Sequence, residues 1–125
     1  MKTQINESDW KLFRKKLPDW QEAYMERLNR EYAALLAGSN KASDKFWELE
    51  KRINSDKEHV GVVARMSRSN MYHNLLSLLD EGAITLDDLA GFSEDLRDSF
   101  AFVMRNRGRG HYNREESYEL MDLSV

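Results

Sequence analysis

WKLFRKKLPDWQEAYMERLNREYAAL, residues 10–35, decides the fold of this 125-residue chain. The large apolar residues in this stretch follow one another at steps of three or four, which is the period of one face of an α-helix. They are Trp10, Phe13, Leu17, Trp20, Tyr24, Leu28, Tyr32 and Leu35. We therefore predict a long helix whose striped face is buried and organises the rest of the molecule.

Pro18 interrupts this stripe, because proline lacks a backbone donor and disfavours a helical conformation at the residue before it. The phase of the stripe is the same on both sides of Pro18. Two interpretations follow: one helix kinked at Pro18, or a short helix over about residues 8–16 and a long one that starts near Pro18. Asn6 and Ser8 are candidate N-caps, and Gly38 is a candidate helix-ending residue.

Beyond Gly38, polar caps and apolar spacing predict three or four shorter helices. Ser43 is the expected cap of the second helix, which should fold back antiparallel on the first because their connection is short. The valine-rich residues 59–66 are expected to form an extended connector that buries Val60, Val62 and Val63. The later predicted caps are Ser67 or Ser69, Thr85 in a Thr85–Asp88 capping box, and Ser93.

These patterns predict an all-α fold, a small helical bundle in which the long N-terminal helix packs against three or four shorter helices. We expect one helical domain over residues 1–104. A flexible tail, first Arg/Gly-rich and then acidic, should follow over residues 105–125, since the apolar periodicity stops there. The predicted core consists of Trp10, Phe13, Leu17, Trp20, Tyr24, Leu28, Phe46, Leu49, Ile53, Leu75, Leu79, Leu86, Leu96 and Phe100.

The composition excludes several classes of protein. The chain has no cysteine, so disulfides, thiolate metal sites and a cysteine nucleophile are excluded. No stretch approaches 18 apolar residues, and the polar first ten residues do not resemble a secretory signal. We therefore expect a cytoplasmic protein with no membrane partner. The net charge of −3 does not indicate a dedicated polyanion binder.

The sequence predicts no catalytic residue, no metal site and no cofactor. His59, His73 and His111 have no second histidine or carboxylate at metal-ligand spacing. Most of the paired acids fall in predicted first helical turns, where negative charge favours the helix dipole. Phosphate loops, serine-hydrolase elbows and zinc-protease motifs are missing from the sequence. A non-enzymatic role follows.

Two kinds of binding remain. Aromatic, leucine and methionine residues exceed what a small bundle needs to fill its core, which favours a protein–protein interaction or regulatory module that binds another protein or a second copy of itself. Trp47 and Tyr112 are the candidate partner contacts. The alternative is a nucleic-acid-binding accessory protein, because an Arg-Gly run beside an aromatic residue is typical of single-strand binding. Its candidate contacts are Arg65, Arg68, Arg105, Arg107 and Arg109.

Two resemblances bear on these hypotheses. LLSLLDEGAITLDDL, residues 75–89, resembles the short C-terminal oligomerisation (SHOCT) pattern of helix, glycine, Ile-Thr and an acidic turn into a second helix. Families with this pattern use it for self-association or docking, which the resemblance implies for this chain.

The second resemblance covers residues 5 to about 100. It rests on NESDWKLFRKKLP (6–18), SDKFW (43–47), MSRSNM (66–71) and ITLDDL (84–89). These segments are similar to those of a family of small uncharacterised Firmicutes proteins that are often labelled "multidrug transporter". The resemblance implies a bacterial protein. The sequence contradicts the transporter label, since no segment is apolar enough to span a bilayer, and the family supplies no catalytic residues to transfer.

Overall fold

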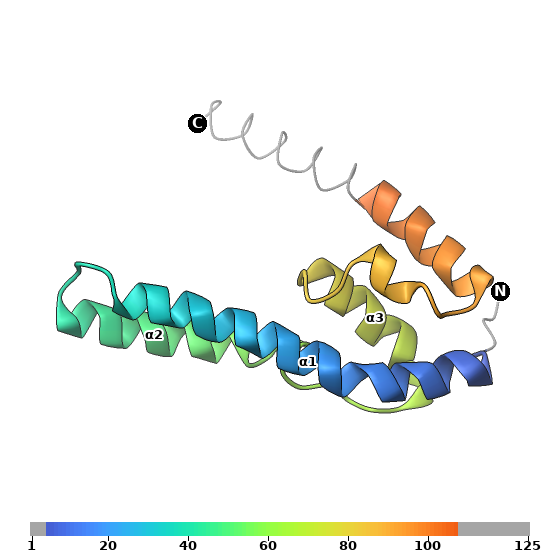
Figure 1. The fold of residues 1–125 in the computed structure, drawn as a ribbon, viewed down its shortest axis with the longest axis horizontal. Coiled ribbons are helices and arrows are strands. Elements are labelled where there is room, and N and C mark those ends of the chain that lie inside the picture. Colours follow the sequence, from blue (N-terminus) through green and yellow to red (C-terminus); the bar gives the residue numbers. More distant parts are fainter. Residues whose placement is uncertain (1–4, 108–125) are drawn as a thin grey trace, which may run out of the picture.

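The computed structural model describes residues 5–107, which are built from helices joined by turns and loops, with no strand among them (Figure 1). The α-helices are α1 (Glu7–Leu36), α2 (Ala42–Asp56), α3 (Met71–Asp80) and a last helix over residues 94–107. Two short 3₁₀ helices are η1 (Arg68–Asn70) and η2 (Leu86–Leu89). The all-α prediction with a long first helix is confirmed. The last helix extends three residues beyond the predicted domain boundary at 104, and most of the predicted tail lies outside the described residues.

Helix α1 runs unbroken through Pro18, so the interpretation of two separate helices is wrong. Pro18 lies on the exposed side of α1, where water can bond the carbonyl that lacks its amide partner. The helix begins at the Asn6 cap, whose side-chain oxygen accepts hydrogen bonds from the backbone N–H groups of Ser8 (2.8 Å) and Asp9 (3.2 Å). Asn6, and not Ser8, is therefore the N-cap.

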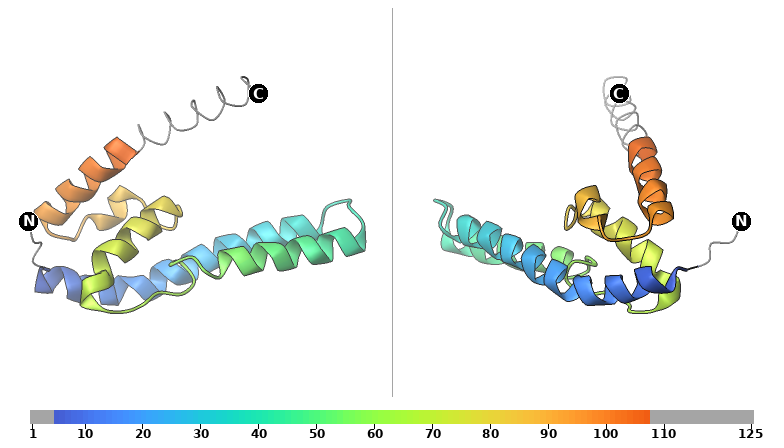
Figure 2. Two further views of the ribbon diagram at one scale, coloured as in Figure 1. Left: turned by 180° about the vertical axis from the view of Figure 1, so that it is seen from behind. Right: turned by 45° about the vertical axis from the view of Figure 1, so that its right-hand side comes forward.

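The molecule has two parts that share α1. We call one part the head, which contains the first half of α1, α3, η2 and the helix 94–107. We call the other part the arm, a two-helix hairpin of the second half of α1 (residues 21–36) and α2. The arm projects from the head in every view (Figures 1 and 2).

The head contains the hydrophobic core. The apolar stripe of α1 is buried there against side chains from α3, η2 and the last helix. The buried set is Trp10, Phe13, Leu17, Met71, Leu75, Leu78, Leu79, Ile84, Leu89, Phe92, Leu96 and Phe100. Each large side chain in such a cluster contributes about 1.5–3 kcal/mol to the free energy of unfolding. Most of the predicted core of the head is thus confirmed.

A buried carboxylate fastens the last helix to the start of α1. Asp9 is almost fully buried, and its two oxygens accept hydrogen bonds from the backbone N–H (2.8 Å) and the hydroxyl (2.6 Å) of Ser93. The Ser93 hydroxyl in turn accepts a hydrogen bond from Leu96 N–H at 3.3 Å. Ser93 is therefore the cap that the sequence predicted, with Asp9 as a second group at the same helix end.

Three residues of the predicted core are exposed instead of buried. Phe46 and Ile53 of α2 are 61% and 40% exposed, because α2 packs on α1 alone and no other element covers its apolar side. Leu86 is exposed because the single turn η2 buries Leu89 in its place. Leu49 is half-buried.

Two further local predictions need correction, while the predicted capping box is confirmed. Ser43 lies inside α2, which begins after Lys41, so Ser43 is not its cap. Val63 of the connector is exposed, because residues 57–62 form turns instead of an extended strand-like segment; Val60 and Val62 are half-buried. The capping box of Thr85 with Asp88 is present, and Gly82 ends α3 with φ of 77°, a left-handed conformation that favours glycine.

The connector between α2 and η1 is held where the arm joins the head. The carboxylate of Glu81, just after α3, accepts hydrogen bonds from the backbone N–H groups of Val60 (2.9 Å) and Gly61 (3.0 Å). The Gln21 side chain donates to the carbonyl of Val60 at 2.9 Å. A Cβ at Gly61 would lie 2.3 Å from a ring carbon of Tyr24, so this close approach requires glycine.

Candidate protein-docking surface

Helix α2 has a regular apolar side, yet none of its residues is buried. Phe46 and Trp47 are 61% and 60% exposed, and their rings contact each other edge-to-face with 4.8 Å between centroids. One more turn along, Leu49 and Glu50 follow, and then Ile53. Large aromatic residues exposed side by side are unusual on a monomer that has no partner.

Polar contacts hold the arm together. Arg52 of α2 pairs with Glu31 of α1 at 2.7 Å, and the Tyr32 hydroxyl donates to Asp56 at 2.6 Å. At the tip, the ammonium group of Lys45 donates to two backbone carbonyls of the α1–α2 turn region, those of Leu36 and Gly38. The side of α2 that faces α1 therefore carries these polar contacts, and Phe46 and Trp47 of the apolar side stay exposed.

The Tyr32–Asp56 hydrogen bond changes the acidity of the phenol. Burial, together with the hydrogen bond to Asp56, raises the pKa of Tyr32 to about 12. The Arg52 guanidinium lies over the Tyr32 ring, 5.5 Å from its centroid, and opposes part of this increase in pKa. Tyr32 therefore stays protonated and keeps donating to Asp56 through the neutral pH range.

Two hollows adjoin each other along the arm. One has a volume of about 370 Å³ and is lined by Phe46, Trp47, Leu49, Glu50, Ile53 and Asn54. The other, nearer the head, has a volume of about 280 Å³ and is lined by Met25, Leu28, Asn29, Tyr32, Ile53, Asp56, Lys57 and Val62. Ile53 lines both hollows, so they form one continuous, mostly apolar surface. We call the lining residues of the two hollows the arm face.

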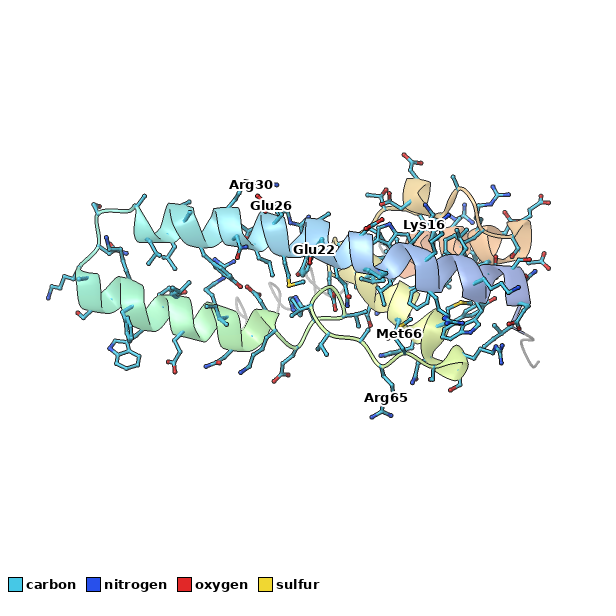
Figure 3. The ribbon with its side chains drawn as sticks, turned by 60° about the horizontal axis from the view of Figure 1, so that its bottom comes forward. Lys16, Glu22, Glu26, Arg30, Arg65 and Met66 are labelled. Atoms are coloured by element: carbon cyan, nitrogen blue, oxygen red, sulfur yellow. The ribbon has the colours of Figure 1, made fainter. Side chains whose placement is uncertain are left out.

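The opposite side of α1 has a different character. Glu26 and Arg30 project from α1 away from α2 and form an exposed ion pair at 3.3 Å (Figure 3). The apolar residues of the arm are thus gathered on one side, which makes the arm face the candidate site. Of the two predicted partner contacts, Trp47 lies in this face, and Tyr112 lies outside the described residues.

The arginines predicted to contact nucleic acid do not form one surface. Arg68 pairs with Glu7 at 2.6 Å at the start of α3, and Arg107 makes two hydrogen bonds, of 3.1 and 2.7 Å, to Asp80 at its end. These two guanidinium groups are therefore separated by the length of α3, about 15 Å for its ten residues.

The other candidate arginines are also dispersed. Arg65 projects from the connector into solvent (Figure 3). The Arg105 guanidinium lies over the ring of Phe102, 5.9 Å from its centroid, and Arg109 lies outside the described residues. The candidate arginines within residues 5–107 thus do not form one continuous basic strip for a phosphate backbone.

Two of the three histidines lie within residues 5–107. His59 shares a 2.7 Å hydrogen bond with the Tyr24 hydroxyl at the junction of head and arm, and His73 is exposed. Within residues 5–107, no group of three or more histidine, aspartate or glutamate side chains is placed to hold a metal ion. His111 lies outside this range.

No helix in the described part of the chain combines the length and the apolar character that crossing a bilayer demands. Comparisons of this chain with protein-family models, with curated proteins and with solved structures find no match. The fold and the candidate site together define a structural class: an all-α protein with a packed head and a helical-hairpin arm that exposes an apolar face.

Proposed function

We propose that this protein is a non-enzymatic protein–protein interaction module that binds its partner through the arm face. The observation that carries the proposal is the uncovered apolar side of α2, a helix without a buried residue. Large apolar side chains exposed next to one another often mark interaction sites on folded proteins. Phe46 and Trp47 provide the aromatic anchors, a residue class that contributes strongly to binding energy at interfaces.

Charge around the arm face supports a protein partner. Glu50 and Lys57 lie among the lining residues and have opposite sign. A surface for nucleic acid or for an anionic membrane carries an excess of positive charge. An apolar centre with charges of both signs at its edge is instead typical of protein interfaces.

Site-specific photo-crosslinking in the native host tests this function. A photoreactive amino acid replaces Trp47 in one variant and Phe102 in a control variant, since Phe102 of the head is exposed to a similar extent, 58%. We expect a defined crosslinked polypeptide from position 47 and none from position 102. If position 47 yields no crosslinked polypeptide, or if both positions yield the same ones, the arm face is not a docking surface.

A further inference from the structure

The arm face is complementary to itself, and we propose that it binds a second copy of this chain. In this dimer two arms pack face to face, antiparallel, around a twofold axis, and form a four-helix bundle. The inference rests on the proposed function and names the partner. A twofold interface uses the same surface on both subunits, so each protrusion must meet a matching hollow on the same face.

The arm face holds such a protrusion and such a hollow. Phe46 and Trp47 form an edge-to-face pair of exposed rings on α2 near the tip of the arm. The 280 Å³ hollow between α1 and α2 lies nearer the head and is lined by apolar side chains that include Met25, Leu28 and Ile53. Its volume suits a large aromatic side chain, and its lining is apolar enough to receive one.

The distance between the ring pair and the hollow allows both contacts to form in the same dimer. Phe46 and Lys57, which lines the hollow, are separated along α2 by about 16 Å. A twofold axis that crosses α2 close to Ile53 brings the rings of each copy opposite the hollow of the other and keeps the two Glu50 side chains apart. Each copy then contributes one ring pair and one hollow, so the interface closes and no further copies are added.

Charges on the face match in the same arrangement. Glu50 lies beside the ring pair, and Lys57 lies beside the hollow, two helical turns or about 10 Å further along α2. When the rings enter the hollow, Glu50 of each copy comes within one helical turn of Lys57 of the other. Two opposite-charge pairs therefore flank the apolar centre. Neither side chain has a hydrogen-bond or ion-pair partner within the described part of its own chain.

The arm is accessible to a second arm of equal length. It projects clear of the head (Figure 2), so two antiparallel arms place their heads at opposite ends of the bundle. The 15 residues of α2 give a face about 22 Å long and about 20 Å wide, a footprint of roughly 450 Å² per copy. A standard interface buries about 800 Å² per partner. We therefore expect a reversible dimer with a dissociation constant in the micromolar range.

Sedimentation velocity on the full chain over a range of about 1–500 μM tests the dimer, with a Phe46→Ser variant and a Phe102→Ser control. Wild type and F102S should shift from monomer to dimer across this range, and F46S should need at least tenfold more protein. Circular dichroism verifies that both variants keep the helical content of the wild type. A wild type that stays monomeric at 500 μM overturns the proposal, as does an F46S dimer of wild-type affinity.

Charge reversal provides a second and sharper test. Glu50→Lys places like charges opposite each other at both flanking positions of the dimer, and so does Lys57→Glu. Each variant alone should dimerise at least tenfold more weakly, whereas an equimolar mixture of E50K and K57E, or the double variant alone, should recover the wild-type affinity. A mixture that stays as weak as the single variants contradicts this pairing and overturns the proposed arrangement.

These results are distinguishable from failure of the proposed function. If the purified chain is monomeric but position 47 crosslinks to a different protein in the host, the arm face is a docking surface and the dimer is wrong. If position 47 crosslinks within its own chain, to residues beyond 107, both proposals fail, because the arm face is then covered by the same molecule.

Discussion

The head and the arm use the same helix, α1, but they differ in how many elements cover it. In the head, the stripe of α1 is enclosed by α3, η2 and the last helix, and Phe13 is fully buried. In the arm, α1 packs against α2 and, near the head, against the connector, and α2 contains no buried residue. Two helices share a single interface, so each keeps an uncovered side unless a third element or a partner packs on it.

This difference indicates where stability is located, and it underlies our proposal for where binding occurs. Regions with few buried apolar contacts open locally at a small fraction of the global free energy of unfolding. The arm depends on polar pairs such as Arg52–Glu31, which are partly exposed and contribute little individually. The head therefore provides the stability, and the arm keeps an apolar surface available for association.

The largest effect is expected from a substitution in the centre of the head. Phe13 has no exposed surface, so Phe13→Ala removes a full ring from the core and leaves a cavity. Such changes lower the free energy of unfolding by about 3–5 kcal/mol. Urea denaturation followed by far-UV circular dichroism measures the loss. If F13A cost no more than Phe46→Ala on the arm, the contrast between head and arm would be wrong.

The second largest effect is expected when the buried carboxylate of Asp9 is removed. This carboxylate joins the start of α1 to the start of the last helix. Asp9→Ala leaves the backbone N–H and hydroxyl of Ser93 without their acceptors in a buried site. We expect a loss of about 2–3 kcal/mol, because hydrogen bonds to charged groups are among the stronger ones. Asp9→Asn keeps one acceptor oxygen and should lose less. A D9A variant as stable as the wild type would show that these hydrogen bonds do not stabilise the head.

The sequence was sufficient to predict the helices and the buried stripe of the head. The spacing from Trp10 to Leu28 identifies a buried face, and this inference needs only the helical period. The Ser93 cap and the Thr85–Asp88 capping box were also predictable, because their groups are local in sequence. These features depend on neighbours within a few residues.

Apart from Trp47, the residues of the candidate site could not be predicted, because the site depends on the absence of a described element over the apolar side of α2. The spacing of Phe46, Leu49 and Ile53 is the same for a buried helix and for one that awaits a partner. One local signal for the orientation of α2 was available. Arg52 and Asp56 lie four residues apart and mark a polar side of α2, which is the side that meets α1. Contacts distant in sequence, such as Asp9–Ser93, have no signature in the pattern of either segment.

A third prediction concerns the junction between head and arm. Gly61→Ala would place a methyl group 2.3 Å from the Tyr24 ring, so the connector or the ring must move. Overpacking of this kind costs about 1–3 kcal/mol, and it also strains the Glu81 hydrogen bonds to the same loop. Thermal unfolding of G61A beside Gly38→Ala, where the nearest atom is 3.3 Å away, measures the difference. A G61A variant as stable as G38A would exclude a tight junction.

The smallest effect is expected within the arm, at Tyr32. Tyr32→Phe removes the hydrogen bond to Asp56 and should destabilise the arm by about 1 kcal/mol. Hydrogen exchange should show faster exchange in α2 with little change in α3. The wild type should also lose arm stability at high pH. Because the pKa of Tyr32 is about 12 when folded and its ordinary value is 10.0, the unfolded phenol ionises first as the pH rises.

The contribution of Tyr32 is therefore complete below pH 10 and is lost between about pH 10 and 12. Hydrogen exchange is too fast to follow at such pH, so near-UV absorbance of the phenolate and circular dichroism provide the readout. Y32F removes this group from the titration and serves as the control. If wild type and Y32F lose helix with the same pH dependence, Tyr32 does not link the two helices of the arm. A parallel loss in α3 upon Y32F substitution at neutral pH would instead show that head and arm unfold as one unit.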